Sequence, residues 1–169
     1  KIVFVTTPSA TGANRSPLSV QPVLEVQDEF GNPVTVAGTS VTVAIASGGG
    51  TLTNATVTTD ASGRATFAGL TLAGTVGART LSFATAGLPA VTAPVTLTAG
   101  AATTITVVSG NGGSGVAGGV YQPAPVVQVV DADGNPVSNA TLSLTPAATG
   151  SSVQPGTITT DAAGRATIS

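Results

Sequence analysis

Two turn sequences each occur twice in this chain, at nearly the same separation. The segment Asp28–Val34 (DEFGNPV) returns 103 residues later as Asp131–Val137 (DADGNPV), and the segment Thr59–Thr66 (TDASGRAT) returns 101 residues later as Thr160–Thr167 (TDAAGRAT). Two turns that recur together with one period indicate a duplicated module. A period of about 100 residues is the size of a whole domain and is too long for one solenoid repeat. The chain is therefore expected to contain two copies of one domain.

The choice of apolar residues favours strands over helices. Val, Ala and Thr dominate, whereas the sequence contains no Met, Trp or Cys. β-Branched side chains fit the pleated surface of a half-buried sheet better than they fit a helix. The 22 Gly and 11 Pro also interrupt the chain too often for long helices to form. We therefore predict an all-β fold.

The first domain is assigned to residues 1–99. It contains about seven short runs of alternating apolar and polar residues, which is the strand number of an immunoglobulin-like β-sandwich. The runs are Ile2–Thr6, Val20–Gln27, Ser40–Ala46, Thr51–Thr59, Arg64–Leu72, Arg79–Thr85 and Ala93–Thr98. At the turns we expect Gly31 to take a positive φ, and the Asp60 carboxylate to accept backbone N–H groups while Gly63 closes the turn.

The second domain is assigned to residues 100–169, and it lacks counterparts of the last two strands or more of the first. Its runs are Thr104–Val108, Pro125–Val130, Thr141–Thr145, Val153–Thr160 and Arg165–Ile168. The apolar side chains without a counterpart are Leu70, Leu72, Leu81, Phe83, Leu88, Val95 and Leu97. At about 1.5–3 kcal/mol per buried side chain, their loss amounts to about 10–20 kcal/mol, whereas a domain has a net stability of only about 5–15 kcal/mol.

This comparison predicts tandem immunoglobulin-like β-sandwiches of which the second is incomplete in this chain. Its missing strands would come from further residues of a longer chain or, as in donor-strand assembly, from a neighbouring chain. The residues between the two domains, 97–103, form a link with only a few irregular positions. Such a short link is expected to restrict relative motion, so that neighbouring repeats stack as a rod.

Charge and residue types exclude several classes of function. The chain carries five basic and seven acidic residues and a net charge of −2, so it has no basic face with which to bind nucleic acid or an anionic membrane surface. No apolar run approaches the roughly 18 residues of a membrane span, so membrane insertion is not expected. With no His and no Cys, the usual general base and thiol nucleophile are missing, and the chain is not expected to be an enzyme.

One turn presents candidate metal ligands. Asp131, Asp133 and Asn135 place oxygen-bearing side chains at alternate positions, as a calcium-binding loop does. Glycine at the fourth place and Leu142 at the twelfth exclude an EF-hand. A looser calcium site at the domain edge, with Asp161 as a further ligand, is the one cofactor hypothesis that the sequence leaves open. The first copy of the turn offers only two carboxylates for such a site.

Two other motifs are better explained by structure than by chemistry. The segment Gly110–Gly115 matches the G-x-G-x-x-G pattern of dinucleotide-binding proteins, but no helix is expected after it to hold a pyrophosphate. It is therefore interpreted as a loop between strands. Asp60 and Arg64 flank one turn and are interpreted as a turn cap with an exposed ion pair worth at most about 1 kcal/mol.

Blocks of residues in both copies resemble one family. In the first copy these blocks are Gln21–Asp28, Gly31–Val34 and Thr59–Asp60 with Gly63–Phe67, and in the second they are Ser109–Gly112, Pro125–Asp131 and Gly134–Val137. Together they resemble the bacterial immunoglobulin-like domains of the invasin and intimin type. The resemblance implies tandem repeats that serve as stalks in large proteins of the bacterial cell surface or the extracellular space.

The function expected from these observations is that of a structural rod or stalk module, without catalysis. Its partners would be neighbouring immunoglobulin-like repeats of the same or an identical chain, including a homo-oligomer or filament. A first alternative is a self-assembling filament subunit whose incomplete domain is closed by a strand from a neighbour. A second alternative is an adhesive or glycan-binding module, although the chain has a single Tyr and no Trp to stack on a sugar.

Overall fold

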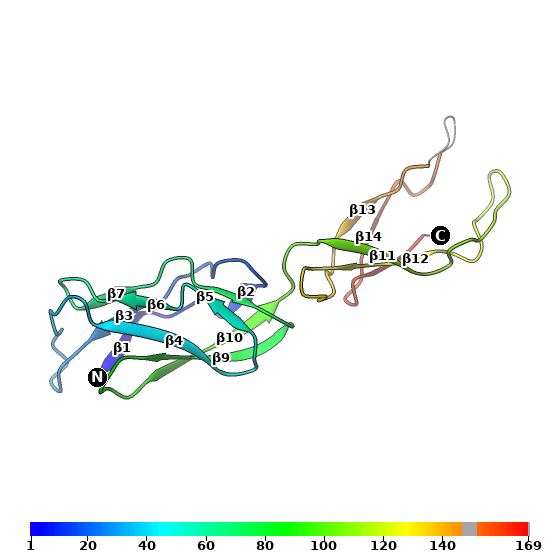
Figure 1. Ribbon diagram of the computed structural model, residues 1–169. Coiled ribbons are helices and arrows are strands. Elements are labelled where there is room, and N and C mark those ends of the chain that lie inside the picture. Colours follow the sequence, from blue (N-terminus) through cyan, green and yellow to red (C-terminus); the bar gives the residue numbers. More distant parts are fainter. Residues whose placement is uncertain (147–151, 169) are drawn as a thin grey trace. The chain divides into compact units, whose positions relative to one another are not determined.

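The computed structural model describes residues 1–146 and 152–168, and these form strands joined by turns and loops, without a helix. The predicted all-β fold is confirmed. The chain divides into two compact units, Lys1–Thr98 and Ala99–Ser169, which are called unit 1 and unit 2 below. Figure 1 shows the strands of each unit.

Unit 1 consists of two principal sheets and a small third one. The first sheet has the order β1-β3-β7, the second has the order β2-β10-β9-β4-β6, and the third contains β5 and β8. The strands are β1 (Ile2–Thr6), β2 (Thr11–Ala13), β3 (Val23–Val26), β4 (Ser40–Ser47), β5 (Thr51–Thr53), β6 (Thr56–Thr58), β7 (Arg64–Thr66), β8 (Thr71–Ala73), β9 (Gly77–Ala84) and β10 (Val91–Thr98).

The core of unit 1 lies between the two principal sheets. Phe83 on β9 is completely buried and makes edge-to-face contacts with Phe4 on β1 and with Phe67, which follows β7. The ring centroids are 5.2 Å apart in the first pair and 5.6 Å apart in the second. Aromatic pairs at this spacing add to the apolar area that they bury. These three rings therefore join the two layers of the sandwich.

Two of the strand runs expected in unit 1 are divided in the structure. The run 51–59 is broken into β5 and β6 at Asn54, whose φ is +57°. The run 64–72 is broken into β7 and β8 near Gly69, whose φ is +70°. Left-handed backbone at one residue redirects the chain, so each half pairs with a different strand.

Strand β2 was not predicted from the sequence. Its three residues, Thr11–Ala13, are too few for an alternating pattern, and its centre is Gly12. Gly12 is buried because Leu18 packs directly over it: a Cβ atom at this position would lie 2.7 Å from Leu18 Cδ2. A side chain at this position would therefore have to displace the end of Leu18. β2 pairs in parallel with the end of β10.

Unit 2 repeats part of this architecture with the same register. The sheet β11-β12-β15 corresponds to β1-β3-β7, and the pair β13-β14 corresponds to β4-β6. Leu24 faces Ala65 in unit 1 as Val127 faces Ala166 in unit 2. The strands are β11 (Thr104–Ser109), β12 (Val126–Val130), β13 (Thr141–Ser143), β14 (Thr157–Thr159) and β15 (Arg165–Thr167).

Candidate functional site

The turn at Asp60 and its copy at Asp161 are built on one carboxylate each. Asp60 Oδ1 accepts hydrogen bonds from the backbone N–H groups of Ser62 and Arg64 and from the Ser62 hydroxyl. Asp161 Oδ1 accepts the equivalent backbone hydrogen bonds at 2.8 and 2.9 Å. The predicted turn cap is confirmed, with Gly63 at a φ of +78°. The hydrogen bonds, with that of the Ser62 hydroxyl as the largest cause, lower the pKa of Asp60.

The ion pair expected across this turn is formed with a different carboxylate. Arg64 Nε donates to Glu25 Oε2 at 3.1 Å, across the β3–β7 pair, whereas Asp60 bonds the backbone of Arg64. A hydrogen bond from the Gln27 amide and the one from Arg64 lower the pKa of Glu25. The expected partner of Arg64 was Asp60, which is close in the chain, but the antiparallel register places Glu25 directly opposite Arg64. In unit 2, Gln128 stands opposite Arg165.

The turns at Asp28 and Asp131 share a geometry in which the aspartate is an acceptor. Asp28 Oδ1 accepts N–H groups of Phe30 and Asn32 at 2.9 and 2.8 Å, and the Asn32 side-chain amide donates to Oδ2 at 3.0 Å. These hydrogen bonds, first of all that of the Asn32 side chain, lower the pKa of Asp28. Gly31 takes the predicted positive φ, +89°.

The candidate calcium ligands lie together in the second copy of this turn. Asp131 is 3% exposed, and its two carboxylate oxygens accept hydrogen bonds from backbone N–H groups of Gly100, Asp133 and Asn135 and from the Asn135 amide. Asp161 forms its separate turn. Within residues 1–146 and 152–168, no group of three or more acidic, His or Cys side chains is placed to hold a metal ion. The calcium site stays a hypothesis.

A buried threonine fixes the loop before the second sheet in both units, which the sequence did not predict. Thr59 Oγ1 donates to the Val36 carbonyl at 2.7 Å and accepts the Thr39 N–H at 3.0 Å. Thr160 Oγ1 bonds Val137 and Ala140 in the same way, at 2.7 and 2.9 Å. Both threonines are 4% exposed. A signal was present, since both stand directly before the repeated aspartate.

A strand near the start of unit 1, β2, pairs in parallel with its last strand, β10. β2 pairs with β10 at Thr96, Leu97 and Thr98. The Thr96 N–H donates to the Ala10 carbonyl at 2.8 Å, and the Asn14 N–H donates to the Thr98 carbonyl at 2.9 Å. The strand that follows the N-terminal strand is thus hydrogen-bonded along its length to the last strand of the unit.

A charged side chain occupies an inward position of β9. Arg79 alternates with Leu81 and Phe83 on the buried face of the strand and is itself 5% exposed. Its guanidinium donates to the carbonyl oxygens of Ala78 and Thr75, and its Nε has no hydrogen-bond partner among the described residues. Alternation along the expected run 79–85 puts position 79 on the same face as Leu81 and Phe83, but a buried cation was not predicted there.

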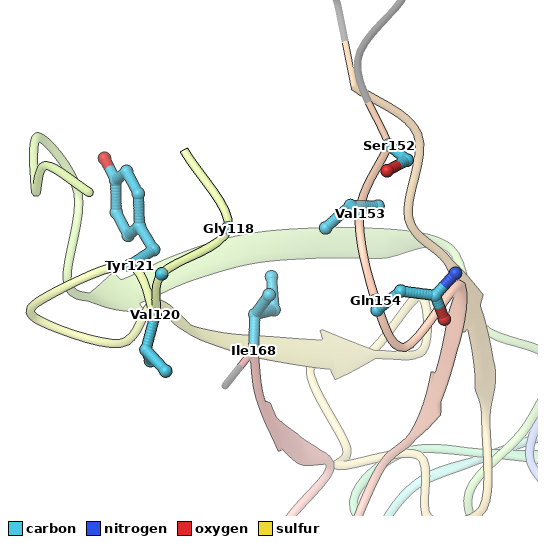
Figure 2. Close-up of a pocket in the computed structure, with 8 residues that line it drawn as sticks. Gly118, Val120, Tyr121, Ser152, Val153, Gln154 and Ile168 are labelled. Atoms are coloured by element: carbon cyan, nitrogen blue, oxygen red, sulfur yellow. The ribbon is translucent and has the colours of Figure 1, made fainter. Parts of the chain in front are cut away.

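One hollow of unit 2 is lined by two of its loops and by the residue that follows β15. Its volume is about 440 Å³, and its lining residues are Gly118, Gly119, Val120, Tyr121, Ser152, Val153, Gln154 and Ile168. Figure 2 shows the side chains of Val153 and Ile168 on the two sides of this space. Ile168 follows β15 just as Phe67 follows β7, and Phe67 is buried against Phe83 of β9.

The glycine-rich segment beside this hollow forms a loop, as predicted. Ser114 pairs with Gln122 through backbone hydrogen bonds of 2.9 Å in both directions. Gly113 is enclosed by this bridge, because a Cβ atom there would lie 2.5 Å from the Gln122 carbonyl oxygen. No helix follows Gly115, so the segment lacks the helix N-terminus on which dinucleotide binding depends. None of the described segments is a helix long and apolar enough to cross a membrane.

Comparison with known proteins gives structural similarity at low identity. No family model matches the sequence, and no curated protein matches it. The structure is similar to the D0-D1 domain of intimin, at 23% identity and a TM-score of 0.39, over 99% of this chain and 81% of that one. It is also similar to a C-terminal fragment of intimin in complex with the intimin-binding domain of the translocated intimin receptor, at 23% identity and a TM-score of 0.43.

A third similar structure contains domains 4–9 of the surface layer protein SbsC, at 19% identity and a TM-score of 0.39. This chain spans 45% of the intimin fragment and 27% of the SbsC structure, while 76% and 97% of its own length is covered. Two of these three structures are of intimin, the type of protein whose immunoglobulin-like domains the repeated blocks of sequence resemble.

Proposed function

We propose that this chain is a structural repeat module that bears tension and sets spacing in a bacterial surface or fibre protein, without catalysis. The observation that carries the proposal is the parallel pairing of β2 with β10 in unit 1. The chain enters unit 1 at β1, which directly precedes β2 in the sequence, and leaves it at the end of β10. Figure 1 shows the N-terminus and the end of β10 at opposite ends of unit 1.

This arrangement determines how tension acts on the hydrogen bonds. Pulling on both ends of unit 1 draws β2 and β10 in opposite directions along their common axis. Because the two strands are parallel, the bonds of Thr96 and Asn14 lie across the direction of sliding and share the load. The antiparallel β1–β3 pair is likewise displaced along its length. Unit 1 therefore cannot be opened by peeling apart one bond at a time.

Other features support the same role. The aspartate turns and the buried threonines fix the strand register of both units from within their loops. The chain has only 7% charged residues, so neighbouring modules repel one another weakly. The described residues bring no acid–base pair of side chains into a pocket, and the hollow of unit 2 is lined by Val, Gly, Ser, Gln, Tyr and Ile. A surface or extracellular location is part of this proposal.

Single-molecule force spectroscopy on a concatemer of the whole chain tests this role. Thr96→Pro removes the N–H that bonds Ala10 and should lower the peak unfolding force of unit 1. Thr92→Pro is the matched control, because its N–H points to the same side of β10 by strand alternation but lies beyond the end of β2. β10 already contains Pro94, which lies two residues from both Thr92 and Thr96 and so has the same orientation in the strand. Proline is therefore compatible with β10 at both substituted positions.

The expected result is a lower peak force for the Thr96 variant and an unchanged force for the Thr92 variant, at equal extension per unfolding event. An equal effect of both substitutions on the peak force would contradict the load-bearing assignment. Extension of the unsubstituted chain without a force peak, as an unstructured linker extends, would also contradict it. The comparison needs forced unfolding, because the rate under load depends on the barrier to unfolding and not on equilibrium stability.

One observation favours a second candidate. The hollow of unit 2 is lined by Tyr121, the single tyrosine of the chain, together with Val120 and Val153 (Figure 2). A glycan-binding or adhesive role would place its ligand there, since an aromatic face can stack on a sugar ring. Binding of the whole chain to a glycan array, lost on Tyr121→Ala, would favour that role over a purely structural one.

A further inference from the structure

The second copy of the aspartate turn accepts a hydrogen bond from a residue outside the turn. Asp131 Oδ2 accepts the N–H of Gly100 at 2.9 Å, in addition to the donors from its own turn. Gly100 lies 31 residues earlier in the chain. The donors that the described residues provide to Asp28 are Phe30 and Asn32, which both belong to its own turn. The two turns therefore share their internal geometry, and the second one also holds a distant backbone position.

The link between the two units is hydrogen-bonded on both sides of Ala99. Within unit 1, the Thr98 carbonyl accepts a backbone N–H at 2.9 Å. Within unit 2, the N–H groups of Gly100 and Thr103 donate at 2.9 Å to Asp131 and to the carbonyl at the end of β12. Each peptide unit is planar, so a residue contributes only its two soft dihedral angles to bending. Ala99 is therefore the residue between a backbone position held in unit 1 and one held in unit 2.

The acceptor of the Gly100 bond is suited to hold a backbone position. Hydrogen bonds to a carboxylate are shorter and stronger than those between neutral groups. Asp131 is 3% exposed, so little water reaches its oxygens to compete with the N–H group. Further bonds from Asp133 and Asn135 orient the carboxylate, which cannot rotate away from Gly100 without breaking them. The turn thus presents a fixed acceptor to the link.

We propose that Asp131 is the positioning residue of the link: its carboxylate holds Gly100 on unit 2 and confines bending between the units to Ala99. This assignment goes beyond the load path proposed for unit 1, because it concerns the link and not the resistance of one unit to tension. It also gives the buried aspartate of the candidate calcium turn a role that needs no metal. A cation bound by Asp131 would compete with the Gly100 N–H for the same oxygen and would loosen the link.

Hydrogen exchange in the unsubstituted chain tests the bond itself. After correction for sequence effects, we expect the Gly100 amide to exchange at least about tenfold more slowly than the Ala101 and Ala102 amides, as one hydrogen bond to a carboxylate implies. Among the described residues neither alanine donates its N–H to an acceptor, so both serve as internal references. Equal exchange at the three positions would overturn the proposal, whatever the behaviour of any variant.

Asp131→Asn and Asp28→Asn form a matched pair of variants. The same change is made in the same turn, and of the two aspartates only Asp131 bonds the link. The chain contains no Cys, so a pair of spin labels can be attached at Ala90→Cys and Ala162→Cys, one in each unit. Both of these alanines are exposed. The distribution of distances between the labels then reports how far the link bends.

The expected result is that Asp131→Asn removes the protection of Gly100 and broadens the distance distribution, while Asp28→Asn changes neither. Slow exchange of the β12 amides shows that unit 2 stays folded; if Asp131→Asn unfolds it, the Gly100 exchange rate of the unsubstituted chain decides. Equal broadening by both substitutions, or an unchanged distribution in the folded Asp131 variant, would overturn the proposal. Narrowing of the distribution by calcium but not by magnesium would also overturn it, because the turn would then hold the link through a metal ion.

Discussion

Gly63 closes the Asp60 turn, and replacing it by alanine should destabilise unit 1 by more than backbone strain alone. Its φ is +78°, and a Cβ atom would lie 2.2 Å from the Val34 carbonyl oxygen. Gly87 has the same φ of +78° with nothing within 4 Å of its Cβ position. Gly87→Ala therefore carries the left-handed backbone cost of about 1–2 kcal/mol, offset by about 0.4–1 kcal/mol from a less flexible unfolded chain. Gly63→Ala carries the same terms plus a steric conflict.

The steric conflict sets the size of the difference. A backbone oxygen cannot rotate away as a flexible side chain can, so the turn or the loop at Val34 must move. Forced repacking of this kind costs about 1–3 kcal/mol. We expect Gly63→Ala to cost about 2–4 kcal/mol and to exceed Gly87→Ala by about 1–3 kcal/mol. The movement would also disturb the bond from the Val26 N–H to the Gly63 carbonyl, now 3.1 Å.

Urea unfolding of the whole chain, followed by hydrogen exchange on peptides from β3, β4 and β9, measures this difference in unit 1 separately from unit 2. Gly164→Ala provides the parallel experiment in unit 2, where the Cβ would lie 2.6 Å from the Val129 carbonyl oxygen. If Gly63→Ala and Gly87→Ala destabilise unit 1 equally, within about 0.5 kcal/mol, the close approach of the turn to the Val34 loop has no energetic role and the reasoning is refuted.

Three further predictions concern charge, packing and metal. The Ser62 hydroxyl is the first cause of the lowered pKa of Asp60, so the stability from this turn is present above the ordinary carboxyl pKa and is lost as the pH falls through the lowered value. The urea midpoint of unit 1 should thus decrease when the pH is lowered below about 4. Asp60→Asn should lower the midpoint at neutral pH and make this acid-induced decrease smaller; an unchanged decrease would contradict the assignment. Phe83→Leu removes both edge-to-face contacts and should cost about 1–3 kcal/mol in urea unfolding, whereas Phe30→Leu, at a ring that is 83% exposed, should stay within about 0.5 kcal/mol; similar costs would count against the aromatic core. Millimolar calcium should not raise the melting temperature above its value in magnesium, because N–H groups already occupy both oxygens of Asp131; a calcium-specific rise would support the calcium hypothesis.

The regular parts of this fold could be predicted because the sequence repeats them. The duplicated turns indicated one register for both units, Gly31 has the positive φ that was expected, and Gly63 closes its turn as expected. Alternation of apolar and polar residues identified the long strands β1, β4, β9 and β10. These signals are local, since a turn or a strand pattern is contained within a few residues.

The features that could not be predicted depend on contacts between distant segments. β2 is too short to show a pattern, and it forms because β10 offers a partner. The partner of Arg64 is Glu25, 39 residues earlier, which only the sheet register brings opposite it. Arg79 lies at a position that strand alternation places in the core, but its side chain is charged. The calcium candidates share one turn as expected, but their orientation toward N–H donors depends on the folded loop.

The buried threonine determines where evolution and protein engineering can lengthen this repeat. In unit 2, Val137 donates its N–H to Val129 and accepts the Thr160 hydroxyl at its carbonyl. In unit 1 these two bonds are made by different residues, Val34 and Val36. The first repeat therefore holds two extra residues at this one point, and all strands after it keep their register. Loop insertions such as an epitope or a cleavage site should be tolerated between residues 34 and 36. They should not be tolerated between Val36 and Thr39, because both of these residues bond the Thr59 hydroxyl.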